Sequence, residues 1–135
     1  KPLQTPHPPL LIGGASAAAH RRVARFGDGW HTLRQSPSQF ANGRREIIRL
    51  TEEAGRDPSG LHYSLTLPMQ FTGTAPGAPV HDRTALTGTD DDVAETVRAY
   101  QAAGLDEIVV SVSTADLDRN TDAMAHFMQR VWLKL

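Results

Sequence analysis

The chain has 135 residues, no cysteine, and a formal net charge of −1 from 14 Lys and Arg against 15 Asp and Glu. This length suits one domain with a sizeable core, and a hydrophobic fraction of 39% argues against wholesale disorder. The charge balance argues against a nucleic-acid partner. No apolar run is as long as a membrane span, which needs about 18 residues. The lack of cysteine excludes disulfides and thiolate sites and fits the cytoplasm. Since the chain starts Lys1-Pro2-Leu3 without an initiator Met, we expect a piece of a longer chain.

The first predicted strand is the apolar run at residues 10–12, which indicates a strand buried on both faces. A helix is predicted from about Ser16, a natural N-cap, to Phe26. Gly27 is a natural residue beyond its end. Val23 and Phe26 are spaced to face a sheet.

The second unit has a strand near residues 28–33 and a helix with strong start signals. Ser36 is the predicted N-cap, Pro37 stands at the first helical position, and Gln39 completes a capping box. The predicted apolar side of this helix consists of Phe40, Ile47, Ile48 and Leu50.

The third strand is predicted at residues 61–71, where apolar and mostly polar side chains alternate. Pro68 lacks the N–H of a ladder donor, so the regular strand is expected to end or bulge there. A long Gly/Pro-rich stretch follows from Thr72 to about Gly88. It is either a lid or binding loop, or a mobile insertion.

The third helix is predicted to start at Thr89, with three aspartates in its first turn, and to end at Gly104. A fourth strand at residues 105–112 and a last helix at about residues 118–133 complete the pattern. The expected core stripes are Val93, Val97 and Tyr100 on the third helix, and Met124, Phe127, Met128, Val131 and Trp132 on the last.

These elements predict an α/β chain with a (βα)4 pattern and parallel, right-handed connections. Two architectures remain open, a small doubly wound sheet and half of a (βα)8 barrel. The alternation at residues 61–71 favours the half-barrel, because one face of each strand then meets helices while the other faces an interior that can hold polar groups.

The best local motif is the glycine turn at residues 12–16, followed at once by a helix. Gly13 and Gly14 let the backbone approach a ligand closely, while the helix N–H groups and the Ser16 hydroxyl can hold a phosphate. The alternative is an ordinary turn with an ordinary N-cap. The motif matches neither the Walker A loop nor the dinucleotide-binding fingerprint.

A second motif, Asp-Gly-Trp-His, occupies residues 28–31. Asp28 can cap a turn or bind a ligand, Trp30 can pack in the core or against a flat ring, and His31 can exchange a proton. The six histidines show no helical metal-ligand spacing with a nearby acid, so no metal site is expected. No residue stands out as a catalytic acid or base.

Together these motifs resemble the luciferase-like monooxygenase family, most of all its branch of deazaflavin (coenzyme F420)-dependent oxidoreductases. The resemblance rests on six segments: residues 6–16, the arginine-rich stretch 21–25, and residues 27–30, 54–58, 87–89 and 100–109. It implies that residues 1–135 are the C-terminal half of a TIM barrel, strands five to eight. It also implies an oxidoreductase that transfers a hydride between F420 or FMN and an organic substrate, possible monooxygenase activity included.

Carried onto this chain, the resemblance places Gly13, Gly14, Ala15 and Ser16 at the cofactor phosphate and Trp30 and His31 near its ring. It implies that open sheet edges are covered by the missing N-terminal half or by a second copy. The alternative is a non-catalytic (βα)4 domain that binds a phosphate ligand or a protein partner. Under this alternative, Trp30 is expected to be buried as core.

Overall fold

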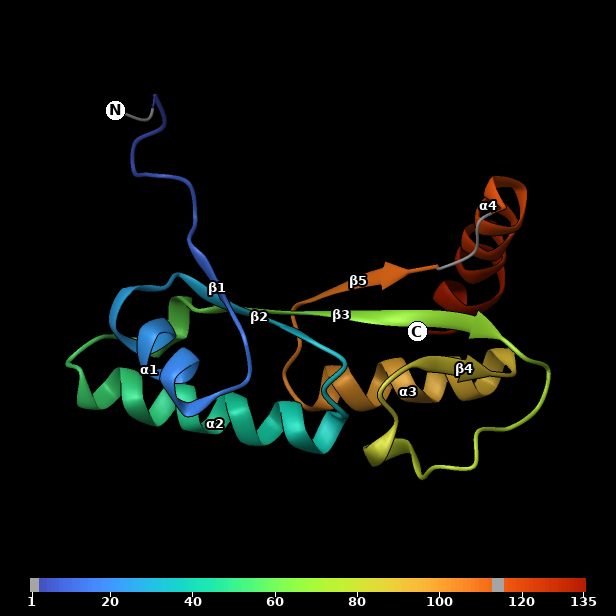
Figure 1. Ribbon diagram of the computed structural model, residues 1–135, viewed down its shortest axis with the longest axis horizontal. Helices are drawn as coiled ribbons and strands as arrows, with labels where there is room; N and C mark the ends of the chain where they lie inside the picture. The colour runs from blue at the N-terminus through green and yellow to red at the C-terminus, as the bar shows by residue number, and fades with distance from the viewer. Residues whose placement is uncertain (1–2, 113–115) are drawn as a thin grey trace.

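The computed structural model describes residues 3–112 and 116–135 and shows a parallel sheet covered by helices (Figure 1). Its strands are β1 (Leu11–Gly13), β2 (Gly29–Leu33), β3 (His62–Phe71), β4 (Leu86–Gly88) and β5 (Glu107–Ser111). The long strand β3 is central, because it pairs with β2, β4 and β5, while β1 pairs with β2. Within the described residues the sheet is open, because β1 pairs only with β2, and β4 and β5 each pair only with β3.

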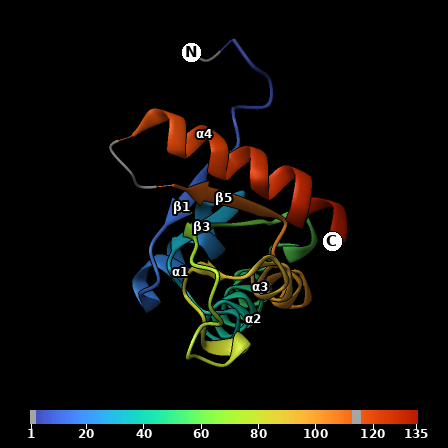
Figure 2. The same cartoon turned by 90° about the vertical axis from the view of Figure 1, so that its right-hand side faces the viewer.

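Three helices lie together on one side of this sheet (Figures 1 and 2). They are α1 (Ala17–Phe26), α2 (Pro37–Glu53) and α3 (Asp90–Ala102). The last helix, α4 (Leu117–His126), stands apart from them in both views. The chain then continues through a π-helical turn at Phe127–Val131, which packs against α3, and a 3₁₀ turn at Trp132–Lys134. The parallel α/β order predicted from the sequence is confirmed.

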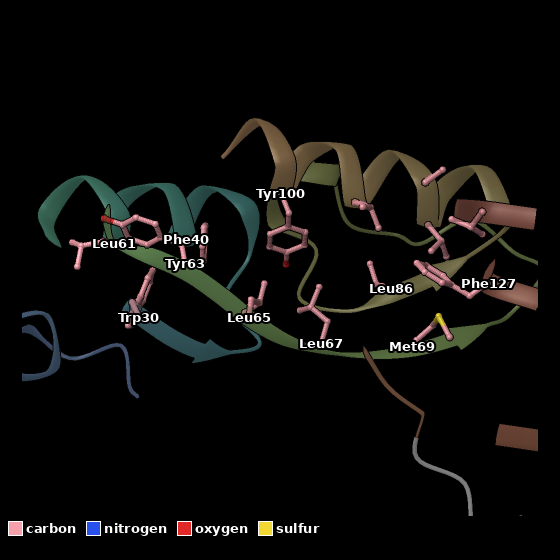
Figure 3. Close-up of a cluster of buried hydrophobic side chains, with 14 of the residues drawn as sticks. Trp30, Phe40, Leu61, Tyr63, Leu65, Leu67, Met69, Leu86, Tyr100 and Phe127 are labelled. Carbon is pink, nitrogen blue, oxygen red and sulfur yellow. The ribbon is translucent and has the colours of Figure 1, made fainter. Parts of the chain in front are cut away.

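The core lies between β3 and the helices α2 and α3, as Figure 3 shows, and Val23 of α1 also belongs to it. Trp30 stacks on Phe40 with ring centroids 5.2 Å apart, and Tyr100 meets Phe40 edge-on at 6.5 Å. The predicted alternation along β3 is confirmed, since Tyr63, Leu65, Leu67 and Met69 are all buried on the helix side.

The capping predictions are confirmed. Ser36 and Gln39 form a capping box at the start of α2, and Thr89 caps α3. The C-terminal end of α1 is closed by Arg56, whose guanidinium donates to the carbonyls of Val23, Ala24 and Gly27 at 2.8–3.2 Å. Residue 56 therefore fixes α1 against the start of β3.

The expectation that Pro68 ends or bulges β3 is wrong. The strand runs through Pro68 to Phe71. The amide nitrogens of the even-numbered residues of β3 face β2, as in the bond from the His62 N–H to the Asp28 carbonyl. At Pro68 the neighbouring strand has already turned away at Arg34, and β4 begins opposite Met69. The missing N–H therefore falls in a gap between two neighbours, where no ladder bond is lost.

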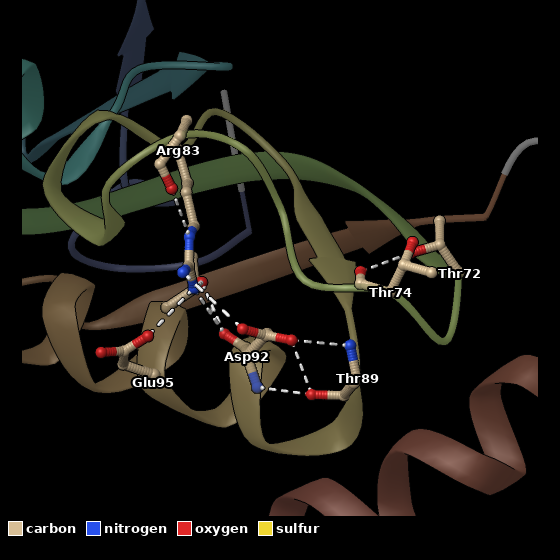
Figure 4. A network of polar contacts seen from close by, with 8 residues as sticks. Thr72, Thr74, Arg83, Thr89, Asp92 and Glu95 are labelled. Atoms are coloured by element: carbon tan, nitrogen blue, oxygen red, sulfur yellow. Dashed lines mark hydrogen bonds and ion pairs between the residues drawn. The ribbon is translucent and has the colours of Figure 1, made fainter.

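The stretch from Thr72 to Gly88 is more ordered than predicted. It contains a 3₁₀ turn at Val80–Asp82 and strand β4. The Arg83 guanidinium anchors it by donating to the Asp92 carbonyl at 3.1 Å and to Thr96 Oγ1 at 3.0 Å, and it pairs with Glu95 at 3.1 Å (Figure 4). Since the side chain of Arg83 is only 10% exposed, these bonds are shielded from solvent.

Three burial predictions are wrong. Leu10 and Leu11 are exposed, the latter because the inner face of β1 has no covering layer among the described residues, and Phe26 points outward beside Arg25. On the last helix only Phe127 and Val131 are buried, while Met124, Met128 and Trp132 are about half exposed. The reason is that this helix packs against α3 at its C-terminal end, through His126 and the π-helical turn that follows it. None of the described helices is long and apolar enough to cross a membrane.

Candidate functional site: the glycine turn and the inner face of the sheet

The glycine turn lies at the carboxyl end of β1, between the strand and α1. Gly14 has φ = 105°, and a Cβ added there would lie 3.3 Å from the Cβ of Ala19. This backbone conformation suits glycine and leaves the turn without side-chain bulk. Residues 13–16 are all exposed, so a ligand can reach the backbone directly.

The start of α1 supplies hydrogen-bond donors next to this turn. Ser16 is the N-cap, and its Oγ accepts the Ala19 N–H at 3.2 Å, which leaves the hydroxyl hydrogen free to donate. The N–H groups of Ala17 and Ala18 belong to the first turn, which has no helical acceptors. The first turn also holds no acidic side chain, so nothing there repels an anion. The sequence prediction of an accessible anion cradle at residues 13–16 therefore has the required geometry.

Strand β2 holds Gly14 through hydrogen bonds to both its N–H and its carbonyl group. The Gly14 N–H donates to the His31 carbonyl at 3.3 Å, and the Trp30 indole Nε1 donates to the Gly14 carbonyl at 2.6 Å. Trp30 is wholly buried on the helix side, where it stacks on Phe40. In this position Trp30 fixes the turn and presents no ring surface to a ligand.

His31 points to the opposite face of the sheet, which we call the inner face. Its Nδ1 lies 2.8 Å from Ser64 Oγ and its Nε2 lies 3.1 Å from Thr66 Oγ1. Because Ser64 donates its own hydrogen to the Trp30 carbonyl at 3.4 Å, Ser64 accepts from Nδ1–H. His31 Nδ1–H therefore donates to Ser64, and Nε2 lies within hydrogen-bond distance of Thr66. The inner face therefore carries an oriented imidazole next to the turn, since His31 pairs in register with Gly13.

Asp28 has a structural position. Its Oδ2 accepts the Leu10 N–H at 2.8 Å, and its backbone bonds to Leu10 and His62. The motif at residues 28–31 thereby ties the entry of β1 to β2 and β3. Among the described residues there is no group of three or more His, Asp or Glu side chains that can hold a metal ion.

Sequence reasoning missed two groups. His20 is buried against the Trp30 ring, and burial lowers the pKa of its imidazole. Arg34 follows β2 with φ = 50° and lines a hollow at the carboxyl ends of the strands. The polar alternation along β3 was a usable signal for the inner face, but the place of Arg34 depends on where β2 turns away.

Comparison with known proteins supports the fold and the family. Similar solved structures include an F420-dependent secondary alcohol dehydrogenase in complex with an F420-acetone adduct (13% identity, TM-score 0.71, 94% of this chain and 49% of that chain). Others are the F420-dependent tetrahydromethanopterin reductase from Methanopyrus kandleri (14%, 0.72, 93% and 50%) and the monooxygenase RslO1 from Streptomyces bottropensis (17%, 0.74, 97% and 49%). At these identities the similarity shows the fold, and this chain spans about half the length of each structure.

The architecture therefore matches part of the TIM-barrel fold of luciferase-like proteins, as the half-barrel prediction requires. The family model for luciferase-like monooxygenases matches residues 1–78, which include the glycine turn, β2 and β3. The chain belongs to the luciferase-like monooxygenase family.

Proposed function

We propose that this chain is the C-terminal half of an oxidoreductase barrel, strands five to eight, and that it binds the phosphate of F420 or FMN. The observation that carries the proposal is the glycine turn at residues 13–16, locked by Trp30 and His31 and open to an anion at the start of α1. Helix N-termini with free N–H groups bind phosphates by charge and geometry together.

The residues present fit a phosphate group. The backbone at Gly14 is bare, and the Ser16 hydroxyl and the amides of Ala17 and Ala18 converge on one exposed end of α1. The cofactor, when bound, supplies the hydride chemistry on an organic substrate, and a flavin can also activate oxygen. The turn would hold the phosphate, and Ser64 and Thr66 hold the His31 imidazole in one orientation on the inner face.

The similar structures include enzymes with F420 and a riboflavin lyase with modified FMN, so both cofactors occur among proteins of this fold. We therefore propose the class, a phosphate-bearing deazaflavin or flavin, and test both members.

A second candidate is a non-catalytic phosphate-binding or interaction domain, and the complete burial of Trp30 is the observation that favours it. A buried Trp30 is also compatible with cofactor binding. Its indole donates to the Gly14 carbonyl and so supports the turn, without any contact to the cofactor's ring. The two candidates differ in whether the ring portion of the cofactor adds affinity beyond the phosphate.

The unpaired strand edges of the sheet indicate that another chain segment covers them. β1 and β5 leave unpaired backbone groups, and Leu11, Leu33 and Val109 expose apolar surface on the inner face. Open edges of this kind promote association. We propose that the other half of the barrel, or a second copy of this chain, covers both edges. Sedimentation over a range of concentrations checks this, and a monomer with protected amides on β1 and β5 would argue against it.

Calorimetric titration with FMN and with F420 tests the proposed function. Gly14→Val puts a side chain on the bare turn, and Ser16→Ala removes one donor, so both are expected to weaken binding, the first by at least tenfold. Ser59→Ala is the matched control, because Ser59 bonds only within its own turn after α2. Circular dichroism verifies that each variant folds. Equal affinity for all four proteins would refute the assignment of the turn.

A further inference from the structure

A hollow of about 320 Å³ opens at the carboxyl ends of β2, β3 and β5. Its lining includes Arg34 after β2, Pro68 and Gln70 on β3, Thr87 on β4 and Ser111 on β5. Pro68 pairs in register with Ser111, and Gln70 pairs with Thr87, so these four residues share the inner face of the sheet. The hollow therefore lies on the same face of the sheet as His31 and, like the glycine turn, at the carboxyl ends of the strands.

Arg34 is the charged residue of this hollow. It is exposed, and neither an ion pair nor a side-chain hydrogen bond ties it to another of the described residues. No acidic side chain is among the lining residues. Its backbone has φ = 50°, a region that non-glycine residues seldom adopt, and it is held there by the bond from its N–H to the Thr66 carbonyl at 3.1 Å. The fold thus keeps an uncompensated guanidinium at the mouth of the inner face.

The other lining groups define the kind of anion. Gln70 and Thr87 offer neutral hydrogen-bond donors, while Pro68 and Ala85 add apolar surface. A guanidinium matches a carboxylate through two parallel N–H···O bonds, and the apolar surface suits a hydrocarbon body attached to it. We propose that this hollow binds the carboxylate of a small organic acid with an apolar body.

The hollow is separate from the glycine turn. β1 and β3 are two strand spacings apart, about 10 Å at a spacing of about 4.8 Å, so the two anion sites do not merge. With both sites occupied, a phosphate and a carboxylate would lie at the carboxyl ends of the strands, with the inner face of the sheet between them. That the organic acid is the substrate of the reaction rests on the proposed function; that the hollow binds a carboxylate does not.

The test uses the full chain and 3-phenylpropionate as the probe, followed by two-dimensional amide NMR and calorimetry. The matched neutral probe is 3-phenylpropionamide, and inorganic phosphate is the third arm. We expect the acid to bind at least tenfold more tightly than the amide and to shift the amides of Arg34, Gln70 and Thr87. Arg34→Gln is expected to abolish this difference between acid and amide. Arg25→Gln makes the same charge change at the end of α1 beside Phe26 and is expected to leave the difference intact.

Arg34→Gly separates a ligand-binding role from a structural one. Glycine adopts φ = 50° without strain, so the variant is expected to unfold at a higher midpoint than the wild type while losing carboxylate binding. Equal binding of acid and amide, retention of acid binding in Arg34→Gln, or tighter binding of phosphate than of the acid at these amides would each overturn the proposal. FMN titration of the same variants distinguishes the two sites, because a failure at the glycine turn affects Gly14→Val and leaves the carboxylate result unchanged.

Discussion

The contact between Gly43 and Trp30 offers a quantitative test of how the turn is held. Gly43 lies in the middle of α2, and a Cβ added there would stand 2.6 Å from Cη2 and 3.2 Å from Cζ3 of the buried indole. Alanine is a better helix former than glycine by about 1 kcal/mol, but overpacking a core costs about 1–3 kcal/mol. We therefore expect Gly43→Ala to lower the free energy of unfolding by about 1 kcal/mol.

Trp30→Phe removes the ring that blocks this Cβ and also the indole N–H that donates to the Gly14 carbonyl. The lost hydrogen bond costs about 1 kcal/mol and the void about 2 kcal/mol, so the single variant is expected to lose about 3 kcal/mol. In that background the Cβ added by Gly43→Ala enters vacated space, and the substitution is expected to add about 1 kcal/mol. The change from a loss of about 1 to a gain of about 1 predicts a coupling energy of about 2 kcal/mol.

Urea unfolding followed by far-UV circular dichroism gives the four free energies of this double-mutant cycle. The same proteins titrated with FMN report on the turn, since Trp30→Phe frees the Gly14 carbonyl and is expected to weaken binding. A coupling energy within about 0.5 kcal/mol of zero would refute the packing argument, because independent sites add to about that accuracy.

Three further predictions concern the scaffold. Arg56→Gln removes the charged donor to three carbonyls at the end of α1 and is expected to cost about 2–3 kcal/mol in chemical unfolding, whereas an unchanged free energy would contradict the cap. Arg83→Met is expected to speed amide exchange across residues 72–88 while leaving α1 unchanged, and uniform protection would show that Arg83 does not anchor the segment. The hydrogen bond from His126 lowers the pKa of Asp90 below its usual value, so this pair stabilises the fold above about pH 4 and loses its effect as the pH falls through the lowered pKa. The difference in unfolding free energy between wild type and Asp90→Asn should accordingly shrink in acid, and a pH-independent difference would contradict it.

The local signals in the sequence were enough for the elements that are fixed by their own residues. Ser36, Pro37 and Gln39 determine where α2 begins, because a capping box is satisfied within one turn. The alternation along β3 likewise identified the buried and inner faces. The helix and strand signals predicted the parallel α/β order, and Gly13 and Gly14 before the N-cap Ser16 predicted the accessible turn.

Features that depend on neighbours far along the chain could not be predicted in this way. Pro68 is tolerated only because β2 ends and β4 begins on the same side of β3. The apolar stripe of the last helix has helical spacing, yet Met124 and Met128 stay exposed, since spacing shows amphipathicity and not what covers the apolar face. The direction of the Trp30 side chain could not be predicted either, because a motif in β2 does not reveal which face of the sheet its side chain occupies.

The central claim is that the glycine turn binds the phosphate of a flavin or deazaflavin cofactor. FMN and riboflavin differ only in that phosphate, so amide NMR titration of the wild-type chain with both isolates its contribution. We expect FMN to bind at least tenfold more tightly than riboflavin and to shift the amides of Gly14, Ser16, Ala17 and Ala18 most. Equal affinity for the two ligands, or FMN-induced shifts that leave these four amides unchanged, would contradict it.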